Sequence, residues 1–374
     1  SLYYSNLITL IRKEILKPIK TDIMTTIYIR TLKRAEHTVF CVQDGQKSYY
    51  DSQFNRYIPY SSGQQVKRSI LDKLSAIINE QPAPTTFIFE VNSKNEIKEG
   101  EVFATCDPSY PDQLFGGWMK AAKGGNEKTV KRRSPLSISA MRALHPLLAG
   151  VDDEKISFDR SDRPNNQVIV RNEKGESLTN KEIEVLLAGK DRSLSRKWIP
   201  NNRRARGLFV QDIAIDLRRL FSVTLNPFEP EISAETEARL REARWVESKN
   251  VFGHCLVAPG TIREKLIPAL AEAIIEWSIT SNQARTFSLM ETLAVTISDN
   301  ANKIATSIRA KLSEEEDNKA NPIIEENLEG VSTYVTLAAG GYIRTKSESF
   351  DALAKAKQKL IELMMAFDYE NQLV

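Results

Sequence analysis

The sequence is poor in the residues that hold metals and disulfides. Its 374 residues include three cysteines, Cys41, Cys106 and Cys255, which lie far apart and form no CxxC pair. This excludes a disulfide framework and fits a reducing cytoplasm. The three histidines also stand singly, and His254 with Cys255 is the only close pair of soft ligands. A four-ligand site needs partners that this neighbourhood lacks, so we expect no metal and no cofactor.

Long apolar runs are missing as well. No stretch approaches the ~20 residues that cross a bilayer, so no membrane partner is expected. With 27% charged and 41% hydrophobic residues, the composition is typical of a soluble globular protein with one large or two ordinary domains. The net charge of +3 is too small to indicate a nucleic-acid partner by itself. The distribution of charge along the chain has to decide that question.

Catalytic motifs are also absent. No GxSxG, HExxH or P-loop pattern occurs, and "GGWMKAAKGG" lacks the strand–loop–helix context of a phosphate cradle. Asp212 and Asp216 face one side of a predicted strand, where pairing with Arg218 or Arg219 is the more probable role. His37 is a conceivable base, but a histidine without a catalytic role is commoner. We therefore expect a protein that is not an enzyme.

The apolar pattern predicts an α+β fold. Strands are expected in "TIYIRTLKRAEHTVFCV", in residues 82–92 and in "RGLFVQDIAIDLRRLFSVTLN", with an ordered loop at residues 46–57. Later segments predict a helix at 233–248 capped by Ser233, a helix at 258–279, a strand at 286–298, and helices at 301–318 and 349–367. Outside a Gly- and Pro-rich block from about residue 100 to 206, the order is βαββαβ, the ferredoxin-like pattern. Its RNA-binding version uses the open face of the sheet.

One helix begins in an unusual way. In "RYIPYSSGQQVKRSILDKL" an extended piece stops at Ser61, Ser62 and Gly63, and a helix follows with Lys67 and Arg68 in its first turns. Its apolar stripe includes Val66, Ile70 and Leu74, and both cations lie off that stripe. The helix is therefore expected to pack by one face and to leave its positive end beside the corner.

Two basic runs lie in the Gly- and Pro-rich block. Against single acids, Glu127 and Asp191, they hold Lys120, Lys123, Lys128, Lys131, Arg132, Arg133 and Arg142, then Lys190, Arg192, Arg196, Lys197, Arg203, Arg204 and Arg206. Each run also carries a tryptophan, Trp118 or Trp198. Cations neutralise phosphates and aromatic rings stack on bases, so this mixture suits single-stranded nucleic acid. A single basic run is often only a solvated face; two runs together favour binding.

The helix-start motif resembles that of the CRISPR-associated backbone subunits of class 1 (Cascade-type) effector complexes, the Cas-seven superfamily, and within it the DevR/Cst-two-like group. "KRRSPLSISAMRALHPLL" and "RGLFVQDIAIDLRRLFSVTLN" are similar to further stretches of that group. The resemblance spans roughly Thr25 to Ile297. It departs at "RAEHTVFCV", where the group often has an Asn- or Gly-rich turn.

The resemblance implies an RRM-like palm with an inserted fingers subdomain and a thumb loop. The expected divisions are an N-terminal extension (1–23, before a natural start at Met24), palm (24–80), fingers (81–205), palm strand (206–225), thumb-like segment (226–255) and the rest of the palm (256–374). It implies a cytoplasmic filament of neighbouring copies on guide RNA, with other subunits as partners and target DNA reached through pairing. The expected RNA-binding residues are Ser61, Ser62, Gly63, Gln64, Lys67, Arg68, Trp118, Lys131, Arg132, Arg133, Trp198, Arg203, Arg204 and Arg206.

At the corner, the expected anion is a guide phosphate. Helix N-terminal amides offer donors, Gly63 lets a backbone approach closely, and Lys67 and Arg68 add full charges. Two alternatives stay open. One is a guide-dependent ribonuclease subunit of the same superfamily that uses Asp44 or Asp51. The other is a stand-alone protein that binds single-stranded RNA.

Overall fold

The structure is a computed structural model that describes residues 23–40, 45–159, 165, 167–192, 194, 196–280 and 287–373, without the side chains of 156–159, 196 and 198–201. The predicted N-terminal extension, Cys41 and Asp44 lie wholly or almost wholly outside this description, as does the side chain of Trp198.

A large mixed sheet forms the centre of the molecule. Its main path runs in the order β19 (Glu348–Ser349), β18 (Ser332–Thr336), β15 (Thr292–Ser298), β1 (Thr26–Thr38), β11 (Arg196–Asp216), β9 (Met141–Ala143), β3 (Arg56–Ser61) and β2 (Ser48–Asp51). Strands β8 (Leu136–Ile138) and β10 (Ala149–Asp159) also pair with β11. Neighbours are antiparallel except β18 and β19. The predicted α+β class is confirmed.

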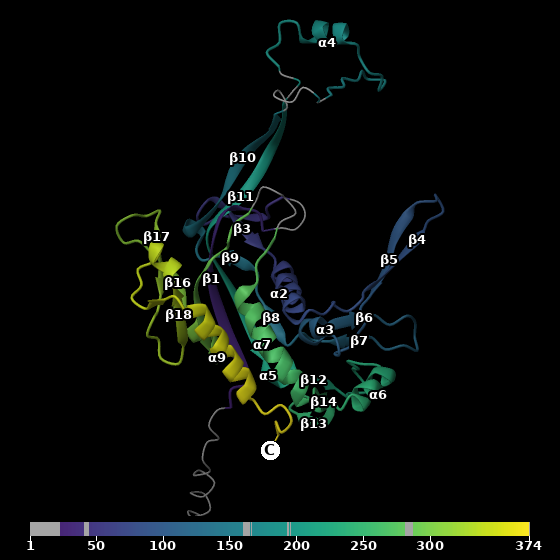
Figure 1. Ribbon diagram of the computed structural model, residues 1–374, viewed down its shortest axis with the longest axis vertical. Coiled ribbons are helices and arrows are strands. Elements are labelled where there is room, and N and C mark those ends of the chain that lie inside the picture. Colours follow the sequence, from purple (N-terminus) through teal and green to yellow (C-terminus); the bar gives the residue numbers. More distant parts are fainter. Residues whose placement is uncertain are drawn as a thin grey trace, which may run out of the picture.

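Three helices lie side by side over one face of this sheet (Figure 1). Helix α2 (Gly63–Ile78) packs on α7 (Gly260–Glu276), and α7 packs on α9 (Ala352–Ala366). The predicted stripe of α2 is correct, because Val66, Ile70 and Leu74 are fully buried there. Alternate residues of β1, such as Ile27 and Ile29, point into the same core.

The opposite face of the sheet is covered too. Leu32 of β1 joins a second core with residues of β11, β15, β16 (Ile308–Leu312) and the 3-10 helix η2 (Leu337–Gly341). Helix α8 (Ala301–Ser307) lies against β1 and β15 on this side, since the Arg30 guanidinium donates to the Ala305 carbonyl. The cover is complete around Leu32, whereas Tyr28, Arg30 and Asp212 on the same face are half-buried and line a hollow of about 420 Å³ beside α8.

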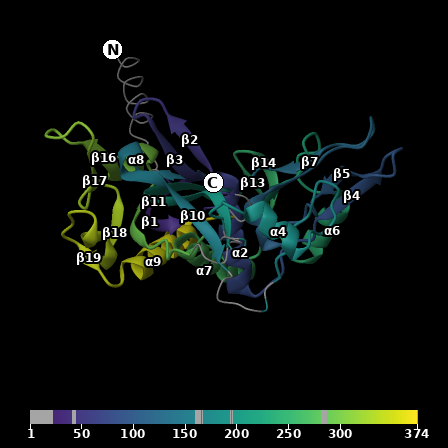
Figure 2. The ribbon, with the colours of Figure 1, turned by 90° about the horizontal axis from the view of Figure 1, so that it is seen from above.

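Several arms project from this centre (Figures 1 and 2). The hairpin of β4 (Thr86–Val91) and β5 (Ile97–Phe103) leaves on one side, and the β10–β11 ladder runs outward to the segment that carries α4 (Asn180–Leu187). Near the base lie α3 (Pro111–Gly116), β6 (Trp118–Lys120), β7 (Val130–Arg132) and α5 (Leu217–Leu220). A small sheet of β12 (Ser222–Thr224), β14 (Gly253–Val257) and β13 (Val246–Asn250) follows, with α6 (Ala234–Glu242). The predicted cap of α6 is confirmed, because Ser233 Oγ accepts from the Thr236 amide.

Several sequence predictions differ from the structure. Residues 46–57 contain β2 and the start of β3 rather than a loop. Among the described residues, the strand at 82–92 pairs with β5 alone, in a hairpin whose turn is closed by Asn92 Oδ1, which accepts from the amides of Lys94 and Glu96. Strands β8 and β9 take the place beside β11 instead.

The predicted helix at 301–318 is wrong beyond its first half. Helix α8 ends at Ser307, and β16 pairs with β17 (Ala320–Ile324). The buried Ser307 hydroxyl shares a hydrogen bond with Thr296 of β15 and donates to the Ile304 carbonyl, which ties the helix end to the sheet. The proposed division at 205 falls inside β11; the domain limits otherwise stay predictions.

An ion-pair network joins the central strands. Arg30 of β1 donates two hydrogen bonds to the carboxylate of Asp212 of β11, at 2.7 and 3.0 Å. Arg142 of β9 donates a third to the same carboxylate at 2.8 Å. Burial alone would raise the pKa of Asp212, but these two arginines outweigh it and lower that pKa. The carboxylate therefore links β1, β11 and β9 within the sheet.

We expect Asp212→Asn to reduce the free energy of unfolding by about 2–3 kcal/mol at pH 7, less than the ~3–5 kcal/mol of a fully buried pair because the side chain is 29% exposed. A carboxylate with a lowered folded pKa stabilises above its unfolded pKa, and this contribution is lost as pH falls through the folded pKa. Urea titrations between pH 7 and pH 2 should thus show the two proteins converging in acid. A difference that stays constant with pH would contradict this role.

Candidate nucleic-acid interface

A basic groove lies along the start of α2. It has a volume of about 950 Å³, and its lining includes the cations Lys47, Lys67, Arg68 and Lys73 against the single acid Asp72. Polar side chains complete the wall, namely Ser62, Gln64, Gln65, Ser69, Ser278 and Thr280. We call this the α2 groove. It brings together Ser62, Gln64, Lys67 and Arg68, four of the residues predicted to bind RNA.

The helix start is built as the sequence predicts. Ser62 is the N-cap, with extended backbone, and its Oγ accepts from the Gln65 amide at 3.2 Å. The first turn holds no acidic residue, so nothing there opposes an anion. Ser61 differs, because it is fully buried and no hydrogen bond is recorded for its hydroxyl in the described part of the chain.

Gly63 has a packing role that the sequence did not reveal. A Cβ at this position would lie 2.9 Å from the Ile138 carbonyl oxygen and 3.3 Å from the Ala140 nitrogen. The glycine therefore lets the start of α2 pack on the backbone of β8. We predicted that Gly63 allows a phosphate to approach closely. In the structure the space beside the Cα of Gly63 is occupied by backbone atoms of this chain.

The four cations of the groove differ in whether another group of the protein pairs with them. Lys67 donates to the Gly116 carbonyl, and burial together with the nearby charge of Arg132 lowers its pKa. Arg68 pairs with Asp72 one turn on at 2.9 Å, a contact between exposed groups that is worth little. No ion pair is recorded for Lys47 or Lys73 within the described residues. The groove thus has a net positive charge that the protein leaves uncompensated.

The first basic run is divided by burial. Lys131 and Arg133 are exposed, but Arg132 between them is only 4% exposed. Its guanidinium donates to the carbonyls of Leu114, Arg219 and Ser222, which joins α3 to α5 and β12. Burial lowers the pKa of Arg132 to about 10, against the attraction of Glu231.

Trp118 lies beside Arg132 in the interior. The ring is 7% exposed, and its Nε1 donates to the Glu231 carbonyl at 2.7 Å. Neither Arg132 nor Trp118 reaches the surface of this chain. Both residues are predicted to contact RNA. In the structure both make hydrogen bonds that hold the segments around α3, α5 and β12 together.

The second basic run is matched by acids from another strand. Arg206 pairs with Asp152 at 2.6 Å, Arg204 with Glu154 at 2.9 Å, and Arg203 approaches Asp153 at 3.7 Å. The acids within the run do not reveal these ion pairs, because the partner acids belong to β10. That strand lies about fifty positions away in sequence and meets β11 through antiparallel pairing. Arg204 is 2% exposed, so it is structural, whereas Arg203 and Arg206 keep part of their surface.

Exposed tyrosines adjoin Arg203. Tyr50 and Tyr57 of the β2–β3 hairpin are 54% and 52% exposed and stack edge to face at 5.4 Å. The Arg203 guanidinium lies over the Tyr57 ring at 4.9 Å. The sequence predicts a loop at residues 46–57 and so does not reveal this pair; the high content of aromatic residues in "YYDSQFNRYIPY", which favours strands, was the available signal.

The candidate catalytic residues have structural partners. Asp51 Oδ1 accepts from the Phe54 amide and closes the β2–β3 turn. His37 has a positive φ and lies 3.3 Å from Glu154. Asp216 pairs with Arg218 and Arg219, which confirms the predicted pairing. In the described part of the chain, no three His, Cys, Asp or Glu residues are grouped to hold a metal, and no helix is long and apolar enough to cross a membrane.

Comparisons with known proteins show a distant likeness in fold. No family model matches the sequence, and no curated protein is significantly similar to it. A chain of a solved CRISPR RNA-guided surveillance complex aligns with a TM-score of 0.43 and 12% identity, covering 92% of this chain and all of that one. A chain of such a complex described as pre-nicking aligns with a TM-score of 0.42 and 10% identity, covering 91% and 89%.

The neighbouring residues Arg132 and Arg133 make a matched test of burial. We expect Arg132→Ala to lower the free energy of unfolding by roughly 3–5 kcal/mol, because it orphans three carbonyls and uncovers Glu231. Arg133→Ala should stay within ~0.5 kcal/mol of wild type. Chemical denaturation measures both. Similar values for the two variants would refute a structural role for Arg132.

Proposed function

We propose that this protein is a backbone subunit of a CRISPR RNA-guided effector complex, and that it binds the phosphate backbone of guide RNA in the α2 groove. The uncompensated charge of that groove is the observation that supports this most. Lys47 and Lys73 have no recorded ion pair in the described residues, and the first turn of α2, which follows the N-cap Ser62 in the same groove, holds no acid. A helix start of this kind suits phosphate.

The arrangement of the central strands supports the finer fold proposal. The order β15–β1–β11–β9, with α2 and α7 over one face, agrees with an RRM-like palm in which 136–143 supplies the remaining strand. Because η2 and β16 cover part of the other face and the unpaired cations lie in the α2 groove, we place the RNA at the helix edge rather than across the sheet. Tyr57 and Arg203 are a second candidate contact, since stacking on aromatic rings is sequence-tolerant.

The groove proposal predicts a change in salt dependence. Replacing Lys47, Arg68 and Lys73 together with Gln should reduce affinity for single-stranded RNA and flatten the plot of log affinity against log salt by about 2, since each phosphate contact contributes ~0.7. Fluorescence anisotropy across a salt series measures this slope. Lys67 is left in place because it also holds the Gly116 carbonyl.

A matched control removes the same charge elsewhere. Lys303, Lys319 and Lys355 are exposed and lie on helix α8, before β17 and on helix α9. Their replacement with Gln should leave the slope within about 0.5 of wild type. An equal loss in both triple variants would mean that general attraction, rather than the groove, binds RNA.

Assembly on RNA is the second consequence. A head-to-tail interface that does not close gives an open filament, so we expect the mass of the complex to rise in steps with RNA length. Multi-angle light scattering on RNAs of increasing length measures it. A single fixed copy on long RNA would favour the stand-alone RNA-binding alternative. In this proposal the subunit performs no cleavage. Mg²⁺-dependent cutting of a complementary RNA that Asp51→Ala abolishes would replace it with the ribonuclease alternative.

A further inference from the structure

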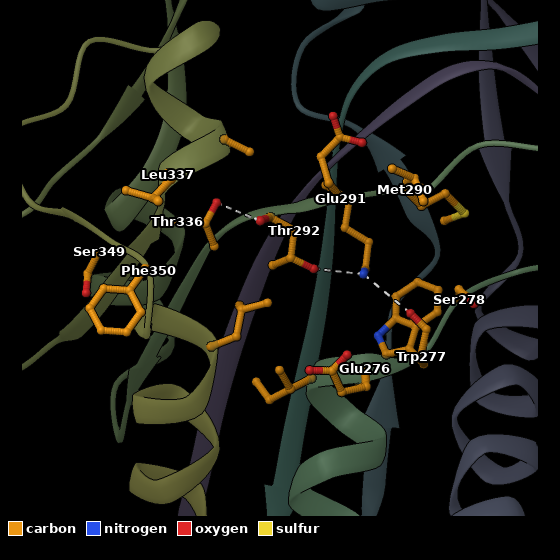
Figure 3. Close-up of a pocket in the computed structure, with 15 residues that line it drawn as sticks. Glu276, Trp277, Ser278, Met290, Glu291, Thr292, Thr336, Leu337, Ser349 and Phe350 are labelled. Carbon is orange, nitrogen blue, oxygen red and sulfur yellow. Dashed lines mark hydrogen bonds between the residues drawn. The ribbon is translucent and has the colours of Figure 1, made fainter.

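A second cavity, of about 540 Å³, lies where the end of α7 meets β15, η2 and the start of α9 (Figure 3). Its apolar wall comes from Leu289, Met290, Leu337, Phe350 and Leu353. Its polar wall includes Lys33, Trp277 and Thr292, and we call the whole the Lys33 cavity. None of the residues predicted to bind RNA lines it.

Lys33 is a buried cation without a direct counter-ion. Its side chain is 3% exposed, and Nζ donates to Thr292 Oγ1 at 3.0 Å and to the Trp277 carbonyl at 3.4 Å. The ammonium also lies over the Trp277 ring at 4.8 Å. No carboxylate of the described residues lies within ion-pair distance, and Glu276 attracts it only from further away. Burial therefore prevails and lowers the pKa of Lys33 to about 8.

Trp277 adds an unpaired donor to the same wall. The residue is 1% exposed, yet its Nε1 is buried with no hydrogen-bond partner among the residues that the structure describes. Figure 3 shows the indole nitrogen directed toward the space near Glu276. An indole nitrogen only donates, and an ammonium has three N–H groups of which two are used here. The cavity thus offers two unused buried N–H groups, the third of the Lys33 ammonium and that of the Trp277 indole, whereas buried donors normally have an acceptor.

We propose that the Lys33 cavity binds a carboxylate attached to an apolar body. The carboxylate oxygens would accept from Lys33 Nζ and Trp277 Nε1, and the hydrocarbon would lie against Leu337, Phe350 and Leu353. A singly charged group fits better than a phosphate, because Glu276 and Glu291 line the same cavity and repel a second negative charge. This inference does not rest on the RNA-binding proposal.

Two sources carry this chemistry. One is a free fatty or aryl acid. The other is an acidic protein segment, and the β4–β5 hairpin of a second copy is one such segment, since it exposes Phe89, Val91 and Ile97 beside Glu90 and Glu99. The experiment below uses both, as sodium octanoate and as a synthetic peptide of residues 85–104, in the absence of RNA.

The test measures the reactivity of Lys33 in the full chain. At pH 8 an unliganded Lys33 is partly neutral and should react with acetic anhydride; a bound carboxylate keeps it protonated and shielded. We expect octanoate or the peptide to slow acetylation of Lys33 at least fivefold, while exposed Lys181 on α4 keeps its rate. Protection by octanoate alone identifies a small acid, and protection by the peptide identifies a protein segment. Inorganic phosphate should protect neither lysine.

Variants separate the two donors. Lys33→Met replaces a buried ion by an apolar side chain of similar length, a change that cores commonly tolerate. It should weaken octanoate binding at least tenfold by calorimetry, and Trp277→Phe should weaken it about threefold. Lys181→Met is the matched control and should bind as wild type does. The wild-type labelling needs no variant to fold. Unchanged Lys33 reactivity with both probes, or protection by phosphate as strong as by octanoate, would overturn the inference.

Discussion

The pairing of β1 with β11 is the constraint on which the rest of the molecule depends. The register runs from Thr26 opposite Asp216 to Thr38 opposite Ala205, and β15 holds the other edge of β1. Alternate side chains of these strands enter the helix-side core and the core under η2, so a slip of one residue would exchange the two sets. Arg30 and Asp212 are register partners and form an ion pair, which makes such a slip costly. The half of β11 that pairs with β10 extends beyond the sheet, and the two strands together form an arm (Figure 1).

Local features were predictable because their causes lie within a few residues. The apolar stripe of α2, its cap at Ser62 and the cap at Ser233 follow from spacing and from side-chain hydrogen bonds that span one turn. The outcome of the charges was not local. Arg204 forms an ion pair with Glu154 of the neighbouring strand, and Arg132 donates to carbonyls of residues up to ninety positions away. A basic run in a sequence shows only the cations. Which carboxylates or carbonyls pair with them depends on the fold.

Burial therefore separates structural cations from those available to a ligand. A guanidinium can satisfy several buried carbonyls at once because its donors spread in a plane, and Arg132 does this at the junction of α3, α5 and β12. Lysines in the α2 groove have no such arrangement, except Lys67. The sequence pattern is the same in both places, a cation within a short basic stretch. The difference arises because Arg132 ends β7 at the junction with α3, α5 and β12, whereas the groove lysines line an open hollow beside the start of α2.

The α2 groove and the Lys33 cavity share one segment of chain. Ser278 lines both, Trp277 belongs to the cavity and Thr280 to the groove, and all three follow directly on the end of α7. Trp277 is fixed by its buried ring and by the bond from Lys33 to its carbonyl, so one wall residue of the cavity also anchors the start of the segment that reaches the groove. Lys33 in turn belongs to β1, opposite Phe209 of β11. The strand pair that orders the sheet thus also positions Lys33, for which no ion pair is recorded among the described residues, and with it the segment between the two sites.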